Sequence, residues 1–473
     1  MISTALSQRR QWWTRLEARP LFWLVGLGAL SGLVYLLALV YGNFRPHRIE
    51  PFLAIFGAAF ALYALAVWLI LRSAQLASQQ RMRLGAIFAF AVLFNLLLLP
   101  SQPSLSDDMF RYVWDGRVQA AGINPYRFAS NAPELAYLRD DSIWQRMNRK
   151  DAVTIYPPFA QMVFAATWRI FPNSVTGFKL VMIGATLLAG WLLVLLLKAL
   201  EQPPERVLIF LWSPLLIFEI AHAGHVDALY LPLIVGAFLL RARSRGSWYA
   251  EAGIGILLGL ATLVKLYPAI LAVPLWSLRD AEGKRRWRLA LPVALVLTVL
   301  AGYAFYLQPG VDTLGFLPKY GKEIFNISPL IHLLIEWGFT QRIPWYQFAN
   351  LGMPLLVGVV SLIFILFPAR SARQAILCCF WPIGIYLLIN HNLFSWYAVW
   401  LLPLLALDLR FSLRAALAWW IFTGTIALSY TFFIYGKEQN WAIWLEFTPV
   451  YALLILAASF AFYRRLRNVP NEA

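Results

Sequence analysis

Long apolar stretches separated by short polar segments follow one another along almost the whole chain. A helix of about 20 apolar residues is long enough to cross the hydrocarbon core of a membrane. Unbroken apolar runs favour such helices over membrane β-strands, in which apolar and polar residues alternate. The pattern predicts an all-α polytopic membrane protein with about 12–14 transmembrane helices. The expected spans cover residues 21–42, 51–71, 84–100, 177–199, 206–220, 227–240, 250–266, 267–278, 289–308, 346–368, 374–390, 396–408, 415–435 and 443–462.

Short basic loops indicate how the spans are oriented, since Lys and Arg are enriched in cytoplasmic loops. Arginines crowd the segment before the first span, and the loops at 72–83, 241–246 and 283–288 are also basic. The tail after the last span contains YRRLR (463–467). We therefore expect both termini in the cytoplasm and the segment that begins at Ser101 on the external side.

The apolar stretch YPPFAQMVFAATWRIF (156–171) decides the direction of every later span. If it crossed the membrane, the basic loops at 241–246 and 283–288 would lie outside. A stretch of this length can instead lie in the interface, or enter the bilayer and return. We predict this second arrangement, a re-entrant or interfacial segment.

Two external segments are too long to be simple turns. Both mix aromatic with charged residues, as amphipathic helices on a bilayer surface do. The first is a large external loop at 101–176, which includes the 156–171 segment, and the second covers 309–345. The sequence indicates no soluble domain. We therefore expect one integral membrane domain over residues 1–473, with its chemistry in the external loops.

The composition excludes two classes of protein. Of the 473 residues 60% are hydrophobic and only 13% charged, against about 25% charged in soluble domains. The formal net charge of +17 could indicate nucleic-acid binding, but the basic residues lie mainly in short loops between spans. The positive charge therefore indicates how the protein is oriented in a membrane. We expect membrane lipids as partners and no binding of nucleic acid.

With this orientation, four groups of polar residues lie on the external side. The richest belongs to the stretch SDDMFRYVWDGRVQAAGINPY (106–126). Ionisable residues at membrane depth are costly, and they are functional candidates for that reason. The four groups are Asp107, Asp108, Arg111 and Asp115; His222, His225 and Asp227; Lys265 and Tyr267; and Asn390, His391, Asn392, Trp396 and Tyr397.

Each group alone also has a structural explanation. The histidines could cap or bridge helices, Lys265 could extend toward the membrane surface, and the aromatic residues could lie in the interface. Asp107 and Asp108 could pair with nearby arginines in a solvated helix. The convergence of all four groups on one side was not used to choose the orientation, and it favours a functional site.

The chemistry of this set suits sugar transfer. Adjacent aspartates in an aqueous cavity can act as a general base or hold a divalent cation such as Mg or Mn. One carboxylate can take the proton that the acceptor hydroxyl must lose. A lipid phosphate leaves as an anion and needs cations, which Lys265, Arg111 or a bound metal could supply. Whether Asp107 and Asp108 bind a metal stays open at this point.

Six short motifs occur in order along the chain: Asp107–Asp108, AGINPY (121–126), IYPPFA (155–160), GHVDAL (224–229), KLYP (265–268) and LFSWYAVWLLP (393–403). With them the sequence resembles the GT-C superfamily of integral-membrane glycosyltransferases from about residue 100 to residue 405. It is most similar to the branch that uses polyprenol-phosphate mannose, which includes the subunit that adds the first mannose of glycosylphosphatidylinositol anchors. The anchor enzymes carry two acids with one residue between them, whereas the two aspartates here adjoin. His225 stands where that family has Asn.

The resemblance implies a GT-C-like bundle and an inverting transfer of a hexose, expected to be mannose. The donor would be a polyprenyl phosphate sugar and the acceptor a hydroxyl on the external leaflet. Asp108 would be the catalytic base, with Asp107 beside it. The donor phosphate would meet Lys265, Arg111 and His391. The residues expected to bind the substrates are Asp115, Tyr126, Tyr156, His225, Asp227, Tyr267, Asn392, Trp396 and Tyr397.

Two further questions concern the class and the place of this protein. A flippase or transporter of a lipid-linked sugar is the alternative, because such proteins also have many spans, but their polar groups lie near the middle of the membrane. Here the polar groups cluster at the external ends of spans.

The acceptor stays open between a glycolipid, a glycan and a protein. Arg exceeds Lys and the loops are compact, which favours a bacterial inner membrane, with the active site facing the periplasm.

Overall fold

The structure is a computed structural model that places most of the chain. It describes residues 19–45, 48–73, 79–244, 246–276, 289–320, 323, 325–326, 328–336, 355, 358–390, 392–412, 415–435 and 440–467. Across these ranges the elements are helices, and the one β-bridge joins Phe325 to Asn392 in parallel. Seven described helices are long and apolar enough to cross a membrane, or up to eight if a bent pair counts as one span. The all-α polytopic membrane class is therefore confirmed.

The helices differ widely in length. The long ones are α2 (Pro20–Tyr41), α3 (Ile49–Ser73), α4 (Gln80–Leu98), α7 (Val175–Ala199) and α23 (Asn440–Arg467). The remaining bundle helices are α10 (Tyr230–Arg243), α11 (Trp248–Thr262), α12 (Ala272–Trp276), α13 (Ala290–Ala304), α15 (Pro329–Glu336), α18 (Ala372–Cys378), α19 (Phe380–Ile389), α20 (Leu402–Asp408), α21 (Ala415–Thr425) and α22 (Phe432–Tyr435). Short 3-10 helices η5 (Tyr267–Leu271), η6 (Ser395–Leu401) and η7 (Ile426–Thr431) precede three of them.

Several expected spans are shorter in the structure than a membrane-crossing helix. The apolar helices at Trp248–Thr262, Tyr267–Trp276, Ala290–Ala304 and Ser395–Asp408 have 10–17 residues, against the roughly 20 needed to cross the hydrocarbon core. The expected span at 346–368 lies partly outside the described residues. The sequence-based number of spans is therefore larger than the number of long helices in the described part of the chain.

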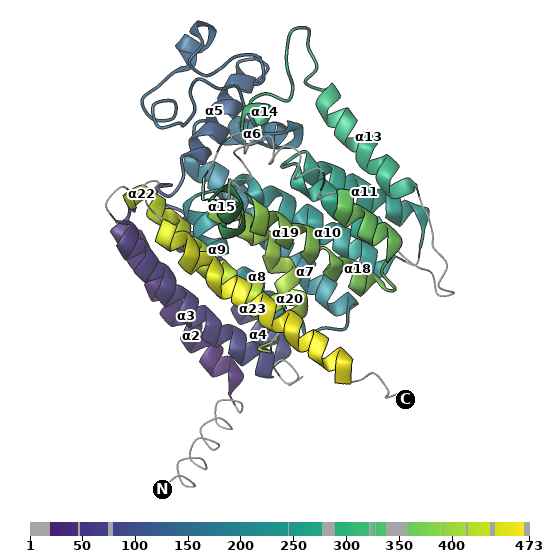
Figure 1. Cartoon of the computed structure of the whole chain (residues 1–473). Helices are drawn as coiled ribbons and strands as arrows, with labels where there is room; N and C mark the ends of the chain where they lie inside the picture. Colours follow the sequence, from purple (N-terminus) through teal and green to yellow (C-terminus); the bar gives the residue numbers. More distant parts are fainter. Residues whose placement is uncertain are drawn as a thin grey trace.

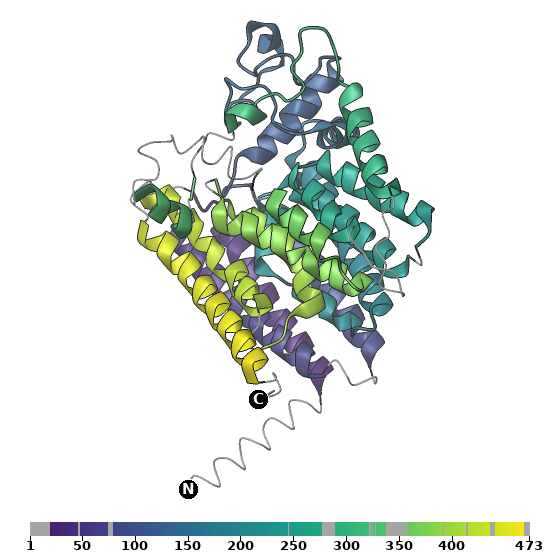
Figure 2. The ribbon, with the colours of Figure 1, turned by 45° about the vertical axis from the view of Figure 1, so that its right-hand side comes forward.

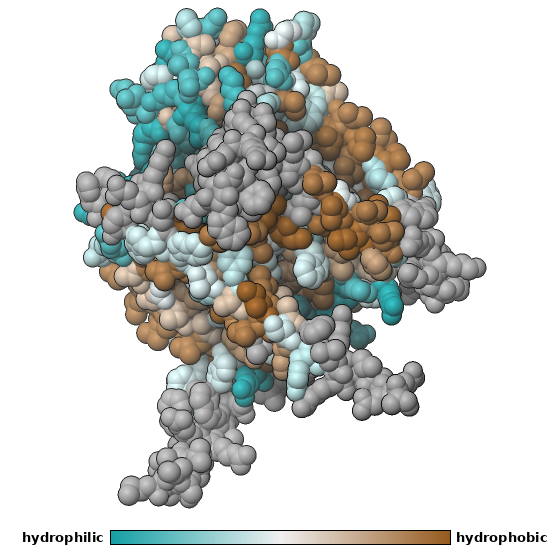
Figure 3. Space-filling model, in the orientation of Figure 1, coloured by the Kyte–Doolittle hydropathy of each residue, from teal (hydrophilic) through white to brown (hydrophobic). Residues whose placement is uncertain are grey.

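The helices form a bundle with a distinct cap at one end. Helix α2 packs on α3 and α4, α10 packs on α7 and α11, and α21 packs on α23. Helices α5 (Asp108–Ala120), α6 (Pro158–Ile170) and α14 (Leu317–Tyr320) lie together at one end, and α2 begins and α23 ends at the other (Figures 1 and 2). Figure 3 shows hydrophilic residues gathered over the capped end and hydrophobic residues on the flanks. A membrane would surround those apolar flanks.

The cap is built from two short helices that touch closely. Helix α5 has an acid, Asp108, in its first turn and a base, Arg117, in its last turn, the arrangement that the helix dipole favours. Helix α6 begins at Pro158, where the missing N–H of proline costs no helical bond. A Cβ on Gly116 would lie 2.7 Å from the Phe164 carbonyl oxygen, so glycine permits this contact. Helix α6 has 13 residues, and its re-entrant or interfacial position stays a prediction.

One helical stretch is broken where it reaches the centre of the molecule. The sequence analysis expects two spans, at 206–220 and 227–240. The structure instead has η2 (Pro204–Val207), α8 (Leu208–Leu211), α9 (Pro214–Ile217), the π-helix η3 (Phe218–His222) and η4 (Val226–Leu229) before α10. The segments Pro214–His222 and Val226–Arg243 meet at 107°. Gly224 stands in this corner with φ +79, which L-residues rarely adopt. The corner turns polar side chains toward one cavity.

Candidate active site

A cavity of about 1100 Å³ lies where the cap meets the bundle. Its walls come from the segment before α5, the loop before α6, the corner of the broken helix, the α11–η5 junction, α14 and η6. Ten of the residues expected at a site line it: Asp107, Asp108, Arg111, Tyr156, Asp227, Lys265, Tyr267, Asn392, Trp396 and Tyr397. Members of all four polar groups of the sequence analysis thus line one cavity, although the groups lie far apart in sequence.

The two adjacent aspartates have different surroundings. Asp107 accepts a hydrogen bond from the Arg45 guanidinium and forms an ion pair with it. Asp108 is half-buried on the cavity wall. Among the described side chains, Asn148 donates to Asp108, with Nδ2 3.0 Å from Oδ1. A carboxylate with so few partners remains able to accept a proton from a substrate hydroxyl.

The tyrosines beside Asp108 are kept protonated. Burial raises the pKa of the Tyr112 and Tyr156 phenols, and the negative charge of Asp108 raises both further. Burial also raises the pKa of Tyr320, which lies on the same cavity. These phenols can donate hydrogen bonds at neutral pH but are poor bases. Asp108 is therefore the better candidate for general base on this wall.

A second wall, at the corner of the broken helix, holds a buried carboxylate and a lysine. Asp227 is fully buried and accepts from the Tyr230 hydroxyl at 2.6 Å and from Trp400 Nε1 at 2.9 Å. The Lys265 ammonium lies 3.0 Å from Asp227 Oδ1. It also lies 3.9 Å from the ring centroid of Tyr397. The Lys265 side chain is thus held between a carboxylate and an aromatic face, and it lines the cavity.

Aromatic rings form the floor between these walls. Tyr267 and Trp400 stack with their centroids 3.5 Å apart and 6° between planes, and Trp400 stacks in turn on Tyr397. The Tyr397 hydroxyl lies 3.0 Å from that of Tyr320. Such rings offer apolar faces and polar edges together, which suits the C–H face and the hydroxyl groups of a sugar.

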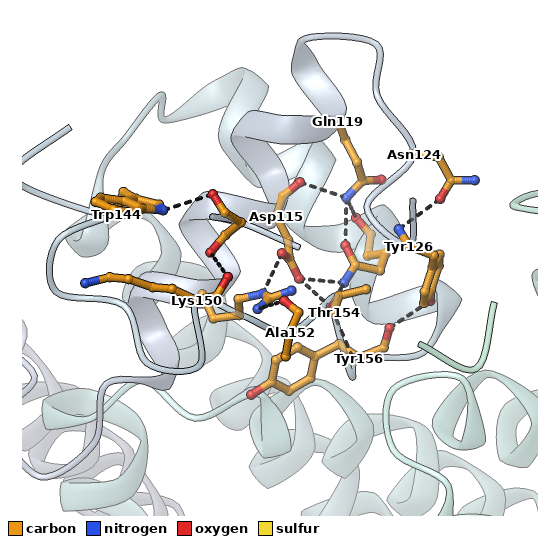
Figure 4. Close-up of polar contacts among 12 residues, drawn as sticks. Asp115, Gln119, Asn124, Tyr126, Trp144, Lys150, Ala152, Thr154 and Tyr156 are labelled. Atoms are coloured by element: carbon orange, nitrogen blue, oxygen red, sulfur yellow. Dashed lines mark hydrogen bonds and ion pairs between the residues drawn. The ribbon is translucent and has the colours of Figure 1, made fainter. Parts of the chain in front are cut away.

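Asp115 lies behind the cavity, at the centre of a buried network (Figure 4). It accepts from Arg111 Nε at 2.8 Å, from Thr154 Oγ1 at 2.6 Å and from Gln161 Nε2 at 2.8 Å. Arg111 also donates to the Ala152 carbonyl at 3.1 Å. Asp115 does not line the cavity. Its hydrogen bond with Arg111 instead holds the Arg111 side chain in place on the cavity wall. Its expected role in substrate binding stays a prediction.

Two other expected residues, Tyr126 and His225, do not line the cavity, and the position of a third is not described. The buried Tyr126 donates to the Tyr156 carbonyl at 2.7 Å (Figure 4). His225 lies behind Trp396, with ring centroids 3.9 Å apart, and its Nδ1 lies 3.0 Å from Glu219 Oε2. His391 lies outside the described residues. Tyr126 and His225 thus support wall residues, and their contact with substrate stays a prediction.

Sequence reasoning missed several residues that the structure brings to the cavity. They are Arg45, Asn148, Arg149, Tyr320, Glu323 and Trp400. Arg45 carried a signal, because an arginine in an expected external turn departs from the positive-inside pattern. Trp400 lies inside the quoted motif LFSWYAVWLLP. The other four lie in the two long segments at 101–176 and 309–345, where the apolar pattern gives no information.

The described residues do not form a preformed metal site. No group of three or more His, Cys, Asp or Glu side chains in the described ranges is arranged to hold an ion. Asp107 is paired with Arg45, so the two aspartates do not converge as free ligands. The adjacent acids therefore do not fit a divalent cation as they stand.

The chain also shares sequence features with a known family. Residues 25–280, more than half of the 473, match a family model described as alpha-(1->6)-mannopyranosyltransferase, N-terminal domain. Neither the curated proteins nor the solved structures gave a match. The matched range includes Arg45, Asp107, Asp108, Asp227 and Lys265.

Proposed function

This chain belongs to the alpha-(1->6)-mannopyranosyltransferase family, and from that membership we propose its reaction in detail. The protein is a multi-pass membrane glycosyltransferase. It moves mannose from a polyprenyl phosphate to an acceptor hydroxyl, with inversion at the anomeric carbon. The observation that carries this proposal is the shared cavity, which Asp108 and Arg111 line from α5 and Lys265 lines from the α11–η5 junction.

The proposed reaction uses Asp108 as the base. Its carboxylate takes the proton of the acceptor hydroxyl as the hydroxyl oxygen bonds to the anomeric carbon. The bond from that carbon to the phosphate oxygen breaks, and the phosphate leaves with the electron pair. Because attack and departure occur on opposite faces of the sugar ring, a β-linked donor gives an α-linked product. No metal ion takes part in these steps.

The leaving phosphate carries the negative charge that develops during transfer. Lys265 is held by Asp227 and the aromatic floor, and Arg111 is held by Asp115 and the Ala152 carbonyl. Fixed cations aimed at a developing charge lower the barrier without reorganisation. The floor of Tyr267, Tyr397 and Trp400 supplies faces for the mannosyl ring.

We assign the capped end of the bundle to the periplasmic side of a bacterial inner membrane. Helix α2 begins and α23 ends at the opposite end (Figure 1), and the basic segments flanking those helices are typical of the cytoplasmic side. A polyprenyl phosphate donor anchored in the outer leaflet would reach the cavity from the membrane. The acceptor is then a glycan or glycolipid with a free hydroxyl.

The first experiment measures transfer by the purified protein in nanodiscs. Labelled polyprenyl-phosphate mannose, or GDP-mannose as a soluble donor, is supplied with a lipid and glycan extract. We expect transfer from the lipid-linked donor alone, and a loss of about 10³-fold for Asp108→Asn, the size of a general-base contribution.

The matched control is Asp141→Asn, an exposed aspartate of the same external loop that does not line the cavity. It should transfer at the wild-type rate. Equal use of GDP-mannose would contradict the donor class. Full activity of Asp108→Asn would contradict the base.

A further inference from the structure

The cavity has a stretch of wall to which the proposed reaction gives no role. Arg45 pairs with Asp107, and its guanidinium carbon lies 4.6 Å from the ring centroid of Phe433 on α22. From there a run of aromatic rings leads away from the two aspartates toward η6. We call this run the aromatic strip, and its members, all of which line the cavity, are Phe325, Phe394, Trp396, Phe432 and Phe433.

Ring contacts fix the members of the strip relative to one another. The Phe325 and Phe394 centroids lie 4.3 Å apart with 14° between the ring planes, and Phe394 stacks on Trp396 at 4.4 Å. Phe432 meets Phe325 edge to face at 4.7 Å. The Phe394 ring also lies 5.9 Å from Tyr397 of the cavity floor. The strip therefore extends from the floor to the side of the cavity where the two aspartates lie.

One polar side chain beside the strip, that of Asn392, lacks hydrogen-bond partners. Only 5% of this residue is exposed, and it lines the cavity. Neither Oδ1 nor Nδ2 of its amide has a partner in the part of the chain that the structure describes. Its backbone is fixed, because Asn392 forms the bridge with Phe325 and the Leu393 N–H donates to the Phe325 carbonyl at 2.9 Å. A buried polar group without a partner is costly, so the open amide indicates a ligand that pairs with it.

The strip and the amide together fit a neutral sugar ring. None of these side chains is charged, and the nearby Arg45 is already paired with Asp107. They therefore offer no countercharge to a phosphate or a carboxylate. Aromatic rings pack against the C–H bonds of a sugar. Two adjacent hydroxyl groups match the Asn392 amide, because one can donate to Oδ1 and the other can accept from Nδ2. A hydrocarbon chain would leave the amide unpaired.

The size of the cavity allows a second sugar beside that of the donor. Its volume is about 1100 Å³, whereas a pocket for one small molecule usually has about 300–1,000 Å³. The floor beside Lys265 is assigned to the mannosyl group of the donor, and the strip continues from that floor. Because the strip ends at Arg45, the partner of Asp107, an acceptor bound along it lies next to the acidic pair.

We propose that the aromatic strip and Asn392 form the acceptor subsite: a neutral sugar of a glycan packs on the rings and offers two adjacent hydroxyls to the Asn392 amide. The inference rests on the proposed function and deepens it, because it names the acceptor as a carbohydrate and gives its place. It also divides the residues expected to bind the substrates. Asn392 and Trp396 serve the acceptor, whereas Tyr267 and Tyr397 serve the donor.

The test is a kinetic comparison in nanodiscs with polyprenyl-phosphate mannose as the donor. The acceptor is a soluble mannose disaccharide with the α-(1→6) linkage that the family description names. Asn392→Ala should raise the acceptor KM about tenfold, the size of one or two hydrogen bonds, and leave the donor KM unchanged. Phe394→Leu, which removes a ring from the strip, should also raise the acceptor KM. The matched control is Asn131→Ala, an exposed asparagine of the 101–176 segment that does not line the cavity, and it should keep both KM values.

Acceptor analogues test the amide even if Asn392→Ala does not fold. Each analogue of the disaccharide lacks one hydroxyl of the terminal mannose. For the wild type, loss of either of two adjacent hydroxyls should raise the acceptor KM about fivefold. Asn392→Ala should be insensitive to the same two losses, because the substitution and the analogue remove the same hydrogen bond.

Four results would overturn the proposal. The first is a higher donor KM for Asn392→Ala with an unchanged acceptor KM, which would place the amide at the donor. The second is a wild type that is insensitive to loss of every hydroxyl except the one that reacts. The third is transfer to a serine peptide and not to the disaccharide, and the fourth is transfer to the lipid and glycan extract without transfer to the disaccharide. Failure of the wild type with that extract would instead contradict the proposed function, so the two failures are distinguishable.

Discussion

The two walls of the cavity hold carboxylates in opposite conditions. Asp108, on the cap, is half-buried and receives one amide from Asn148. Asp227, in the bundle, is fully buried and accepts from Lys265, Tyr230 and Trp400. Satisfied polar networks are rigid and specify one arrangement, whereas a carboxylate with a single partner can exchange it for substrate. From this comparison we expect the bundle wall to position the substrate and the cap wall to supply the group that takes the proton.

The largest effect on stability and activity is expected from removing the Asp227 carboxylate on the bundle wall. Asp227→Asn removes the ion-pair partner of Lys265 in a largely buried place, which costs about 3 kcal/mol or more of unfolding free energy. Lys265 also loses its position, so donor KM should rise together with a fall in kcat. Thermal unfolding in detergent and transfer kinetics measure the two effects.

The control for this prediction is the double variant Asp227→Asn with Lys265→Met, which removes both charges. It should recover much of the stability but not the activity. If Asp108→Asn destabilised the protein as much as Asp227→Asn does, the contrast between the walls would be lost.

A smaller effect is expected from the network behind the cap wall. Asp115→Asn replaces a charge-assisted bond to Arg111 with a neutral one and disturbs the bonds to Thr154 and Gln161. Loss of one hydrogen bond to a charged group costs about 1.5–3 kcal/mol. We expect a lower unfolding temperature and roughly tenfold lower kcat, since Arg111 is no longer fixed on the cavity wall.

Thr154→Val separates the effect on stability from the effect on kcat. It removes one donor to Asp115 and keeps the Arg111 pair, so it should lower stability and change kcat little. A kcat for Asp115→Asn equal to wild type would show that the position of Arg111 does not matter for transfer.

The smallest effect is expected at the ion pair that joins the segments 101–176 and 309–345. Arg149 pairs with Glu323, and 44% of the Arg149 side chain and 25% of the Glu323 side chain are exposed. Exposed pairs contribute about 0–1 kcal/mol. Arg149→Gln should therefore leave the unfolding temperature unchanged and alter kcat/KM at most about twofold, with the difference vanishing at high salt. A large loss of donor affinity would instead assign Arg149 to the phosphate.

The sequence predicts the fold class and many of the residues that line the cavity, but not the contacts among those residues. Hydropathy reports which segments are apolar, and four polar motifs at the ends of apolar runs, Asp107–Asp108, GHVDAL, KLYP and LFSWYAVWLLP, led to one cavity. The pairing of side chains cannot be predicted from this pattern, because the ion-pair partner of Asp107 lies 62 residues earlier in the sequence. Asp115 and Asp108 cannot be told apart by pattern, although one is buried in a network and the other faces the cavity. The break at Gly224 was missed because it falls between two apolar runs.

Trp400 donates to Asp227 across 173 residues of sequence, and this has a consequence for the order of synthesis. A membrane chain emerges from its N-terminus, so Asp227 and Lys265 enter the bilayer long before their indole partner. Until η6 is made, the carboxylate lacks one donor and the floor of the cavity lacks its central ring. A chain that stops short of η6 lacks several residues that line the cavity. We therefore expect the cavity to be complete, and sugar transfer to be possible, only after the segment that contains η6 has been made.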